Sequence, residues 1–377
     1  MISPDMMTWC DLPADDGRIE SVQALPPPKA VLAQLPRDVA AARRVHEART
    51  AIGDILRGAD PRLLVIVGPC SIHDADAAIR YAEWLAEARR RFADRMLVLM
   101  RVYVAKPRTR LGWKGLINDP YVDGSGQVDM GLRLARQIMR TIIELGLPVA
   151  TEFVDPITAQ YLADLVSWAC IGARTSESQV HRELASGLPC PVGFKNGTSG
   201  DVDPAINAVV CARHKHQFVG VTREGTAAVI TTKGNADTHV VLRGGVRPNH
   251  DVATVRLVSA RLREEDACGG VLIDCSHGNS QGRHCRQLEV VSDVCRMLAD
   301  DRRQILGVML ESNLVEGRQQ VIVGVPLVFG QSITDACLGL SDTLRACTML
   351  HEAAAARGAA ERSEAARAQA RIHPCRT

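Results

Sequence analysis

Short apolar runs alternate with amphipathic segments along most of the chain. The runs are rich in Val, Ile and Leu and lack regular polar alternation, which is typical of parallel strands buried on both faces. The segments between them, such as residues 74–92 and 130–146, space their apolar residues as helices do. The predicted strands lie within LLVIVGPC (63–70), MLVLMRVY (96–103), LPVATEF (147–153), WACIGAR (168–174), PVGFKNG (191–197), HVVLRGG (239–245), GGVLIDCSH (269–277) and ILGVMLESN (305–313). The pattern predicts an α/β protein of the (β/α)8 TIM barrel class.

Three segments depart from this alternation. Gln217–Thr222 and Ala227–Thr232 flank a short turn and predict a β-hairpin inserted before the sixth barrel strand. Residues 1–50 form an N-terminal extension that we expect to make regulatory or oligomer contacts, and residues 351–377 form an Ala/Arg-rich tail. The catalytic barrel is expected to span residues 51–350, with the inserted regulatory hairpin at 215–235.

Composition excludes some classes of partner. Hydrophobic residues make up 46% of the 377 residues and aromatic residues 3%, so a large core must be mainly aliphatic. The net charge of +2 gives no reason to expect nucleic acid or a membrane surface as partner. The apolar runs are too short to span a bilayer, and no signal peptide is evident at the N-terminus. We therefore expect a cytoplasmic protein.

Every predicted strand ends in a side chain that can carry charge or bind metal. A single such residue is most simply explained as one partner of an ion pair. Barrel enzymes place their active sites at the carboxyl ends of the strands, so the recurrence at every strand predicts an active site. In chain order the residues are Cys70, Arg101, Glu152, Arg174, Lys195, Arg243, His277 and Glu311.

Cations dominate this set. Arg101, Arg174, Lys195 and Arg243 are joined by Lys106 and Arg108 from the stretch MRVYVAKPRTRLGWK (100–114). Clustered positive charges need anions among them, and guanidinium groups suit carboxylates and phosphates. Two anionic ligands, or one with both a carboxylate and a phosphate, would satisfy them. Lys195 has an alternative interpretation as the Schiff-base lysine of an aldolase.

The remaining strand ends suggest a metal site. Cys70, His277 and Glu311 offer a thiolate, an imidazole and a carboxylate, and Asp335 just past the eighth strand is a candidate fourth ligand. This donor set suits one divalent ion such as Mn, Fe, Co or Zn. A bound metal beside the cations would polarise a carbonyl oxygen while a phosphorylated partner is held.

Several motifs now resemble a known family. GPCSIHD, MRVYVAKPRT, GWKGLINDP, GARTSESQVHRELASG, PVGFKNGT, LRGG, DCSHGN and ESN are similar, in order, to the microbial type I 3-deoxy-D-arabino-heptulosonate 7-phosphate (DAHP) synthases over roughly residues 50–350. The resemblance implies condensation of phosphoenolpyruvate with D-erythrose 4-phosphate and release of phosphate. This is the first step of the shikimate pathway to aromatic amino acids.

The resemblance also implies residue roles. Cys70, His277, Glu311 and Asp335 match the metal ligands, and Cys70, His277 and Lys106 are the expected catalytic residues. For phosphoenolpyruvate, Arg174 and Arg243 are expected to bind the phosphate, and Arg101, Lys106 and Lys195 to lie around the carboxylate and the reacting carbons. For erythrose 4-phosphate, Arg108 and Thr109 are expected to bind the phosphate, with Pro107 beside them. Glu152 is expected to lie behind the basic cluster. Carbon 3 of phosphoenolpyruvate is expected to attack the aldehyde, with Lys106 as proton donor.

Regulation and assembly are implied in the same way. In this family the N-terminal extension and the hairpin form a feedback site for an aromatic amino acid, and Gly220 favours tyrosine over phenylalanine. A homo-oligomer, dimer or tetramer, is expected. Two alternatives are a 3-deoxy-octulosonate 8-phosphate synthase, against which the KPRT segment and the hairpin argue, and a non-catalytic sensor of aromatic amino acids, against which the complete set of strand-end residues argues.

Overall fold

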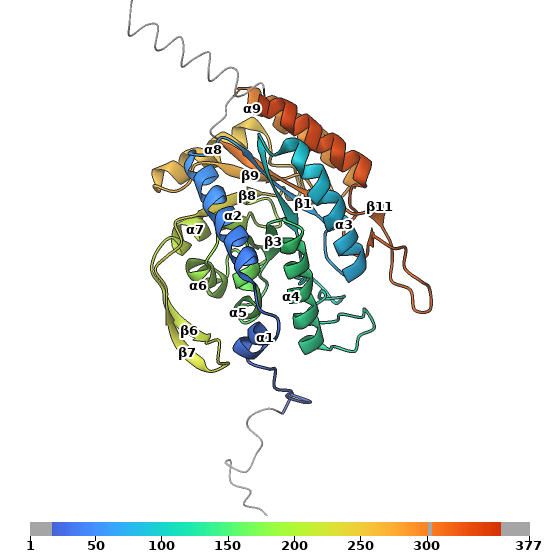
Figure 1. Cartoon of the computed structure of the whole chain (residues 1–377). Coiled ribbons are helices and arrows are strands. Elements are labelled where there is room, and N and C mark those ends of the chain that lie inside the picture. Colours follow the sequence, from blue (N-terminus) through green and yellow to red (C-terminus); the bar gives the residue numbers. More distant parts are fainter. Residues whose placement is uncertain (1–16, 301–303, 356–377) are drawn as a thin grey trace, which may run out of the picture.

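Eight parallel strands close into a barrel, as the sequence predicts (Figure 1). The computed structural model describes residues 17–300 and 304–355. The order around the barrel is β1-β10-β9-β8-β5-β4-β3-β2, in which each strand neighbours the next barrel strand along the chain. The barrel strands are β1 (Leu63–Gly68), β2 (Met96–Arg101), β3 (Val149–Glu152), β4 (Trp168–Ile171), β5 (Val192–Lys195), β8 (Thr238–Leu242), β9 (Val271–Asp274) and β10 (Ile305–Glu311).

Helices between the strands cover the outside of the barrel. Asp74 and Asp251 cap α3 and α8 by accepting the backbone N–H groups of Ala77 and Thr254. The helices are α3 (Ala75–Ala88), α4 (Val128–Glu144), α5 (Ala159–Leu162), α6 (Gln179–Gly187), α7 (Asp203–Ala212), α8 (Val252–Glu264) and α9 (Gln287–Asp300), with short 3-10 turns η1 (Arg89–Phe92), η2 (Ala163–Leu165) and η3 (His284–Arg286). A last helix occupies residues 340–355.

The core consists of two apolar layers, because successive strand residues face opposite sides of the sheet. Leu63, Val65 and Val67 of β1 belong to the layer under the surrounding helices. Leu64 and Ile66 belong to the layer inside the barrel, which also holds Trp168 and Tyr103. Burial on both faces explains the continuous apolar runs of the sequence.

The N-terminal segment closes one end of the barrel. It contains α1 (Pro28–Gln34) and α2 (Val39–Arg57), and Ile52, Ile55 and Leu56 of α2 join the apolar layer inside the barrel. Leu64 and Leu306, near the starts of β1 and β10, lie in the same layer. Thus α2 continues past residue 50, where the extension was expected to end, and it seals the barrel opposite the carboxyl ends of the strands.

The inserted hairpin consists of β6 (Gln217–Val221) and β7 (Ala227–Thr231), which pair antiparallel between β5 and β8 as predicted. Its turn lies against the start of α1, at the lower left of Figure 1. The backbone N–H of Lys29 donates to Arg223 O at 2.8 Å, and the Lys29 side chain pairs with Glu224 at 3.4 Å. The hairpin and the N-terminal segment therefore form one continuous feature on the outside of the barrel.

A loop projects between β11 (Val315–Arg318) and β12 (Gln331–Ser332), visible at the right of Figure 1. It carries several exposed apolar side chains, among them Val323 and Phe329. Among the described helices, none is long and apolar enough to cross a membrane. The expected tail lies outside the described residues from residue 356 onward.

Candidate active site

A polar cavity of about 640 Å³ opens at the carboxyl ends of the barrel strands. Cys70 and Arg101 are fully buried beside it, whereas Gly220 lies on β6 in the hairpin, away from the cavity. The cavity wall includes eleven of the residues expected from the sequence: Lys106, Pro107, Arg108, Thr109, Glu152, Arg174, Lys195, Arg243, His277, Glu311 and Asp335.

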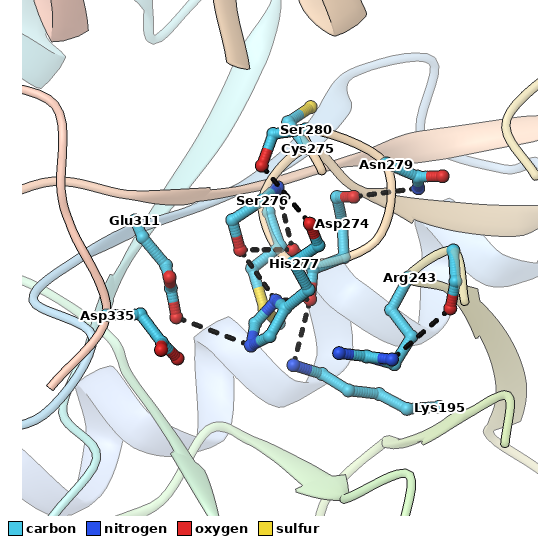
Figure 2. Close-up of polar contacts among 12 residues, drawn as sticks. Lys195, Arg243, Asp274, Cys275, Ser276, His277, Asn279, Ser280, Glu311 and Asp335 are labelled. Atoms are coloured by element: carbon cyan, nitrogen blue, oxygen red, sulfur yellow. Dashed lines mark hydrogen bonds and ion pairs between the residues drawn. The ribbon is translucent and has the colours of Figure 1, made fainter. Parts of the chain in front are cut away.

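Three side chains from distant parts of the chain converge as a group able to hold a metal. One ligand atom each of Cys70, Glu311 and Asp335 lies within 4.8 Å of the others. Two donors bound to one ion at about 2.0–2.3 Å lie no more than about 4.6 Å apart, so the group fits a divalent ion with little adjustment. His277 lies beside the group, with Nε2 3.6 Å from Glu311 Oε1 (Figure 2).

The protonation of this group also fits a cation. Burial, together with the nearby Glu311, raises the pKa of the Cys70 thiol to about 12, and Lys106 opposes the rise. Burial would raise the pKa of Asp335, but Lys106 and His277 outweigh it and hold this pKa at about 2. A bound divalent ion would ionise the thiol, since metal binding displaces the proton of a cysteine ligand. Three of the four expected donors, Cys70, Glu311 and Asp335, therefore form a group that fits a divalent ion, and His277 lies beside it.

Turn geometry brings Cys70 to this position. Gly68 ends β1 at φ +154°, and a Cβ there would lie 2.8 Å from Arg101 O. Glycine thus lets the turn after β1 pack directly against the end of β2. The Lys106 ammonium then reaches the same place from the loop after β2, with Nζ 3.3 Å from Cys70 Sγ and 3.4 Å from Cys70 O.

Arg101 lies beneath the cavity wall with no exposed surface. Its Nη2 pairs with Glu311 Oε1 at 2.8 Å and also donates to Cys70 O at 3.1 Å. Its Cζ lies 3.7 Å from the centre of the Tyr103 ring, a cation–π contact. Burial opposes the charge, but Glu311 and the other nearby groups raise the pKa of Arg101 above its usual value. The guanidinium is therefore charged and held in one orientation.

A second ion pair lies between β5 and β9. Lys195 Nζ is 2.9 Å from Asp274 Oδ2, and both side chains are almost completely buried. The same oxygen lies 3.0 Å from Nδ1 of His277. Burial would raise the pKa of Asp274, but His277 and Lys195 hold it well below its usual range. Asp274 was not assigned a role from the sequence, although it ends β9 and opens the motif DCSHGN.

The opposite wall belongs to the loop after β2. Arg108 and Thr109 are exposed there, and Arg174 Nε donates to Thr109 Oγ1 at 2.7 Å across the cavity. Arg110, Ser276 and Arg318 also line the cavity and had been given no role. For Arg110 the available signal was its place in the basic loop, whereas Arg318 ends β11 and precedes a loop whose course the sequence pattern did not predict.

Three kinds of group therefore surround one cavity. They are the possible metal ligands Cys70, Glu311 and Asp335, the buried pair of Lys195 with Asp274, and the exposed cations. Arg243 adds a partly buried cation to the cavity wall, with its backbone N–H fixed by Asn196 Oδ1 at 2.7 Å. Such a site can hold two anionic molecules next to a Lewis acid. Glu152 is buried beside Gly172, where an added Cβ would lie 2.2 Å from Glu152 Oε1.

Comparisons with known proteins agree with these features. The model of the DAHP synthetase I family matches residues 37–347. The Phe-sensitive phospho-2-dehydro-3-deoxyheptonate aldolase of Escherichia coli K12 is 52% identical over 329 residues, covering 87% of this chain and 94% of the relative. The Trp-sensitive one of Salmonella typhimurium is 46% identical, covering 87% and 94%. The phospho-2-dehydro-3-deoxyheptonate aldolase structure from Francisella tularensis SCHU S4 matches with a TM-score of 0.88 and 47% identity, covering 90% of this chain and 99% of that one.

Proposed function

The chain belongs to the DAHP synthetase I family, and on that premise we propose how its site performs the reaction. The enzyme condenses phosphoenolpyruvate with D-erythrose 4-phosphate and releases phosphate, the first step of the shikimate pathway. The observation that carries the proposal is the cavity itself, where Glu311 and Asp335 on the wall and the buried Cys70 form one group beside several cations. Two phosphorylated substrates require this combination.

We assign the donor substrate to the inner wall. Arg174 and Arg243 hold the phosphate of phosphoenolpyruvate, and Lys195 and Arg101 act around its carboxylate and reacting carbons. Burial of the Lys195 and Arg101 charges, each beside a carboxylate, supports fixed positions for both. The Schiff-base alternative for Lys195 is disfavoured, because an ammonium paired with Asp274 at 2.9 Å is a poor nucleophile.

We assign the acceptor substrate to the outer wall. Arg108 and Thr109 hold the phosphate of erythrose 4-phosphate, with Pro107 and Asp335 beside them. The Thr109 hydroxyl already accepts from Arg174, so the two phosphate sites adjoin each other. This proximity brings carbon 3 of phosphoenolpyruvate near the aldehyde, which is the main entropic requirement of a two-substrate condensation.

Proton transfer is assigned to Lys106. Cys70, His277, Glu311 and Asp335 would hold the metal ion, which would supply a Lewis acid for the aldehyde oxygen. Carbon 3 of phosphoenolpyruvate attacks the aldehyde carbon, and Lys106 Nζ gives a proton to the developing alkoxide. Water then adds to carbon 2, and the C–O bond to phosphate breaks. Lys106 suits this role because its ammonium lies next to the possible metal ligands, 3.3 Å from Cys70 Sγ.

The identity of the metal is open among manganese, iron, cobalt and zinc. A thiolate with an imidazole and carboxylates is compatible with each of them. Metal analysis of the purified protein, followed by reconstitution of the metal-free protein with each ion in turn, distinguishes them by the activity restored.

We further propose feedback control by an aromatic amino acid at the hairpin and the N-terminal segment, with tyrosine as the favoured effector. The contact of Lys29 with the hairpin turn joins the two elements. The choice of tyrosine rests on the resemblance alone, in which a glycine at the position of Gly220 on β6 favours tyrosine. Titration of the activity with phenylalanine, tyrosine and tryptophan tests this choice, and inhibition by phenylalanine alone would refute it. The expected homo-oligomeric assembly and cytoplasmic location stay predictions.

The substrate assignment is tested by a choice of acceptors. Steady-state consumption of phosphoenolpyruvate is measured with erythrose 4-phosphate and, separately, with arabinose 5-phosphate. We expect turnover with the four-carbon acceptor and little with the five-carbon one. The reverse preference would point to a 3-deoxy-octulosonate 8-phosphate synthase, and no turnover with either would favour a non-catalytic sensor.

A further inference from the structure

One buried carboxylate contacts both functional halves of the site. Asp274 ends β9 and has no exposed surface. Its Oδ2 lies 2.9 Å from Lys195 Nζ on one side and 3.0 Å from His277 Nδ1 on the other (Figure 2). Lys195 belongs to the site proposed for phosphoenolpyruvate and His277 to the metal site. Asp274 therefore joins them without lining the cavity itself.

The surroundings of Nδ1 determine which nitrogen of His277 is available to a metal. Nδ1 lies 2.6 Å from Ser276 Oγ, with which it forms a hydrogen bond, and 3.0 Å from the Asp274 carboxylate. Both oxygens favour a proton on Nδ1, so the neutral imidazole keeps its lone pair on Nε2. Nε2 is the nitrogen on the side of the possible metal ligands, 3.6 Å from Glu311 Oε1. Histidine ligands of metals commonly donate their other N–H to a carboxylate in this way, which fixes the ring and strengthens the ligand.

Asp274 is itself held so that Oδ2 faces Lys195 and His277. Its Oδ1 accepts hydrogen bonds from the backbone N–H of Ser276 at 3.1 Å and from Ser276 Oγ at 2.8 Å. The backbone is fixed as well, because Asn279 Nδ2 donates to Asp274 O at 2.9 Å. His277 then adopts φ 53°, a left-handed turn that brings its ring back toward Asp274.

From these contacts we propose that Asp274 is a positioning residue, which orients His277 Nε2 toward the metal and Lys195 toward phosphoenolpyruvate. The inference rests on the proposed function and deepens it. Because one oxygen serves both partners, a change at Asp274 alters metal binding and substrate binding together. A residue with a purely structural role would lower stability without changing either.

The substitution Asp274→Asn tests the proposal, with Asp164→Asn as matched control. Asp164 is also a largely buried carboxylate paired with a buried arginine, Arg136 at 2.6 Å, but it does not line the cavity. Each metal-free protein, as the full chain, is dialysed against Co²⁺ alone. Its Co²⁺ affinity, visible absorption spectrum and free energy of unfolding are measured.

We expect Asp274→Asn to bind Co²⁺ 10–100-fold more weakly, the usual effect of losing the carboxylate behind a histidine ligand. Its Co²⁺ spectrum shifts because the imidazole is no longer held, and its KM for phosphoenolpyruvate rises. Asp164→Asn loses stability but keeps the Co²⁺ affinity and spectrum of the unaltered protein. Equal Co²⁺ affinity and spectrum for Asp274→Asn and the unaltered protein would overturn the inference while leaving the proposed function intact.

Two further variants keep the test decisive. Asp274→Asn could fail to fold because Lys195 loses its counter-charge. In that case the double variant Asp274→Asn with Lys195→Met is used, since it removes the unpaired charge. Weakened Co²⁺ binding by the double variant supports the proposal, and unchanged binding overturns it. Ser276 Oγ also lies 2.6 Å from His277 Nδ1. If Ser276→Ala weakens Co²⁺ binding as much as Asp274→Asn does, the hydroxyl and not the carboxylate positions the ring. Failure of the unaltered protein to bind Co²⁺ would instead refute the proposed metal site.

Discussion

Replacing Arg101 by methionine breaks an ion pair that lies wholly inside the protein. Arg101 Nη2 and Glu311 Oε1 are 2.8 Å apart, and the two side chains are 0% and 1% exposed. The guanidinium also donates from Nε to Pro69 O at 3.1 Å. Methionine retains much of the apolar stem but supplies neither the charge nor the hydrogen bonds, so Glu311 is left as a buried anion.

The expected cost follows from the burial. Removing one partner of a buried ion pair typically costs about 3–5 kcal/mol, because the other charge remains without compensation in a region of low dielectric constant. An exposed pair of similar length contributes only about 0.2–1 kcal/mol. Arg90 and Glu87 form such a pair at 2.9 Å, with side chains 75% and 68% exposed. Arg90→Met is therefore a control with the same chemical change.

The free energy of unfolding is measured with denaturant for the unaltered protein, Arg101→Met and Arg90→Met. A chelator is present throughout, so that metal binding does not contribute. We expect Arg101→Met to lose about 3–5 kcal/mol and Arg90→Met less than about 1 kcal/mol. Adding Glu311→Leu to Arg101→Met should restore much of the loss, since no charge is then left unpaired. Equal small losses for both single variants would refute the reasoning.

Two other predictions concern catalysis and pH. Lys106→Arg should lower kcat by about 10²–10⁴-fold with little change in the KM for phosphoenolpyruvate, because a guanidinium does not release a proton; steady-state kinetics check this, and a retained kcat would remove Lys106 as proton donor. Burial lowers the pKa of His239 to about 3, and Trp168 Nε1 donates to its Nε2 at 3.2 Å. The folded protein thus keeps His239 neutral while the unfolded chain protonates it near pH 6.5, so stability should fall by roughly 1.4 kcal/mol per pH unit below 6.5. Unfolding curves of His239→Gln should show a shallower loss between pH 6.5 and 4, and an identical slope would contradict this assignment.

Much of the barrel could be predicted because each strand is buried on both faces. The apolar layers on the two sides of β1 require the continuous run Leu63–Gly68, which a surface strand would not show. The boundary expected at residue 50 was less reliable, because α2 runs through it to Arg57 and packs on the barrel. The spacing of apolar residues identifies a helix, but it does not show which part of the protein the helix packs against.

The residues of the candidate site could be predicted from the sequence for a related reason. In a parallel barrel all strand ends meet at one rim, so Arg174 and Arg243 could be placed together without knowing their side-chain contacts. Asp274 could not be predicted in this way, because it ends the same strand that His277 follows, and the strand end alone does not show that both side chains have a role. The role proposed for it depends on two distances, to Lys195 and to His277, that no sequence spacing contains.

The proposed function requires a divalent metal beside the cations that hold the two phosphorylated substrates. The most direct test is the initial rate of phosphoenolpyruvate consumption with erythrose 4-phosphate, measured before chelation, after complete metal removal, and after a divalent ion is added back. We predict that activity disappears with the metal and returns on adding at least one of manganese, iron, cobalt or zinc. Undiminished activity in protein shown to be free of metal would contradict the account.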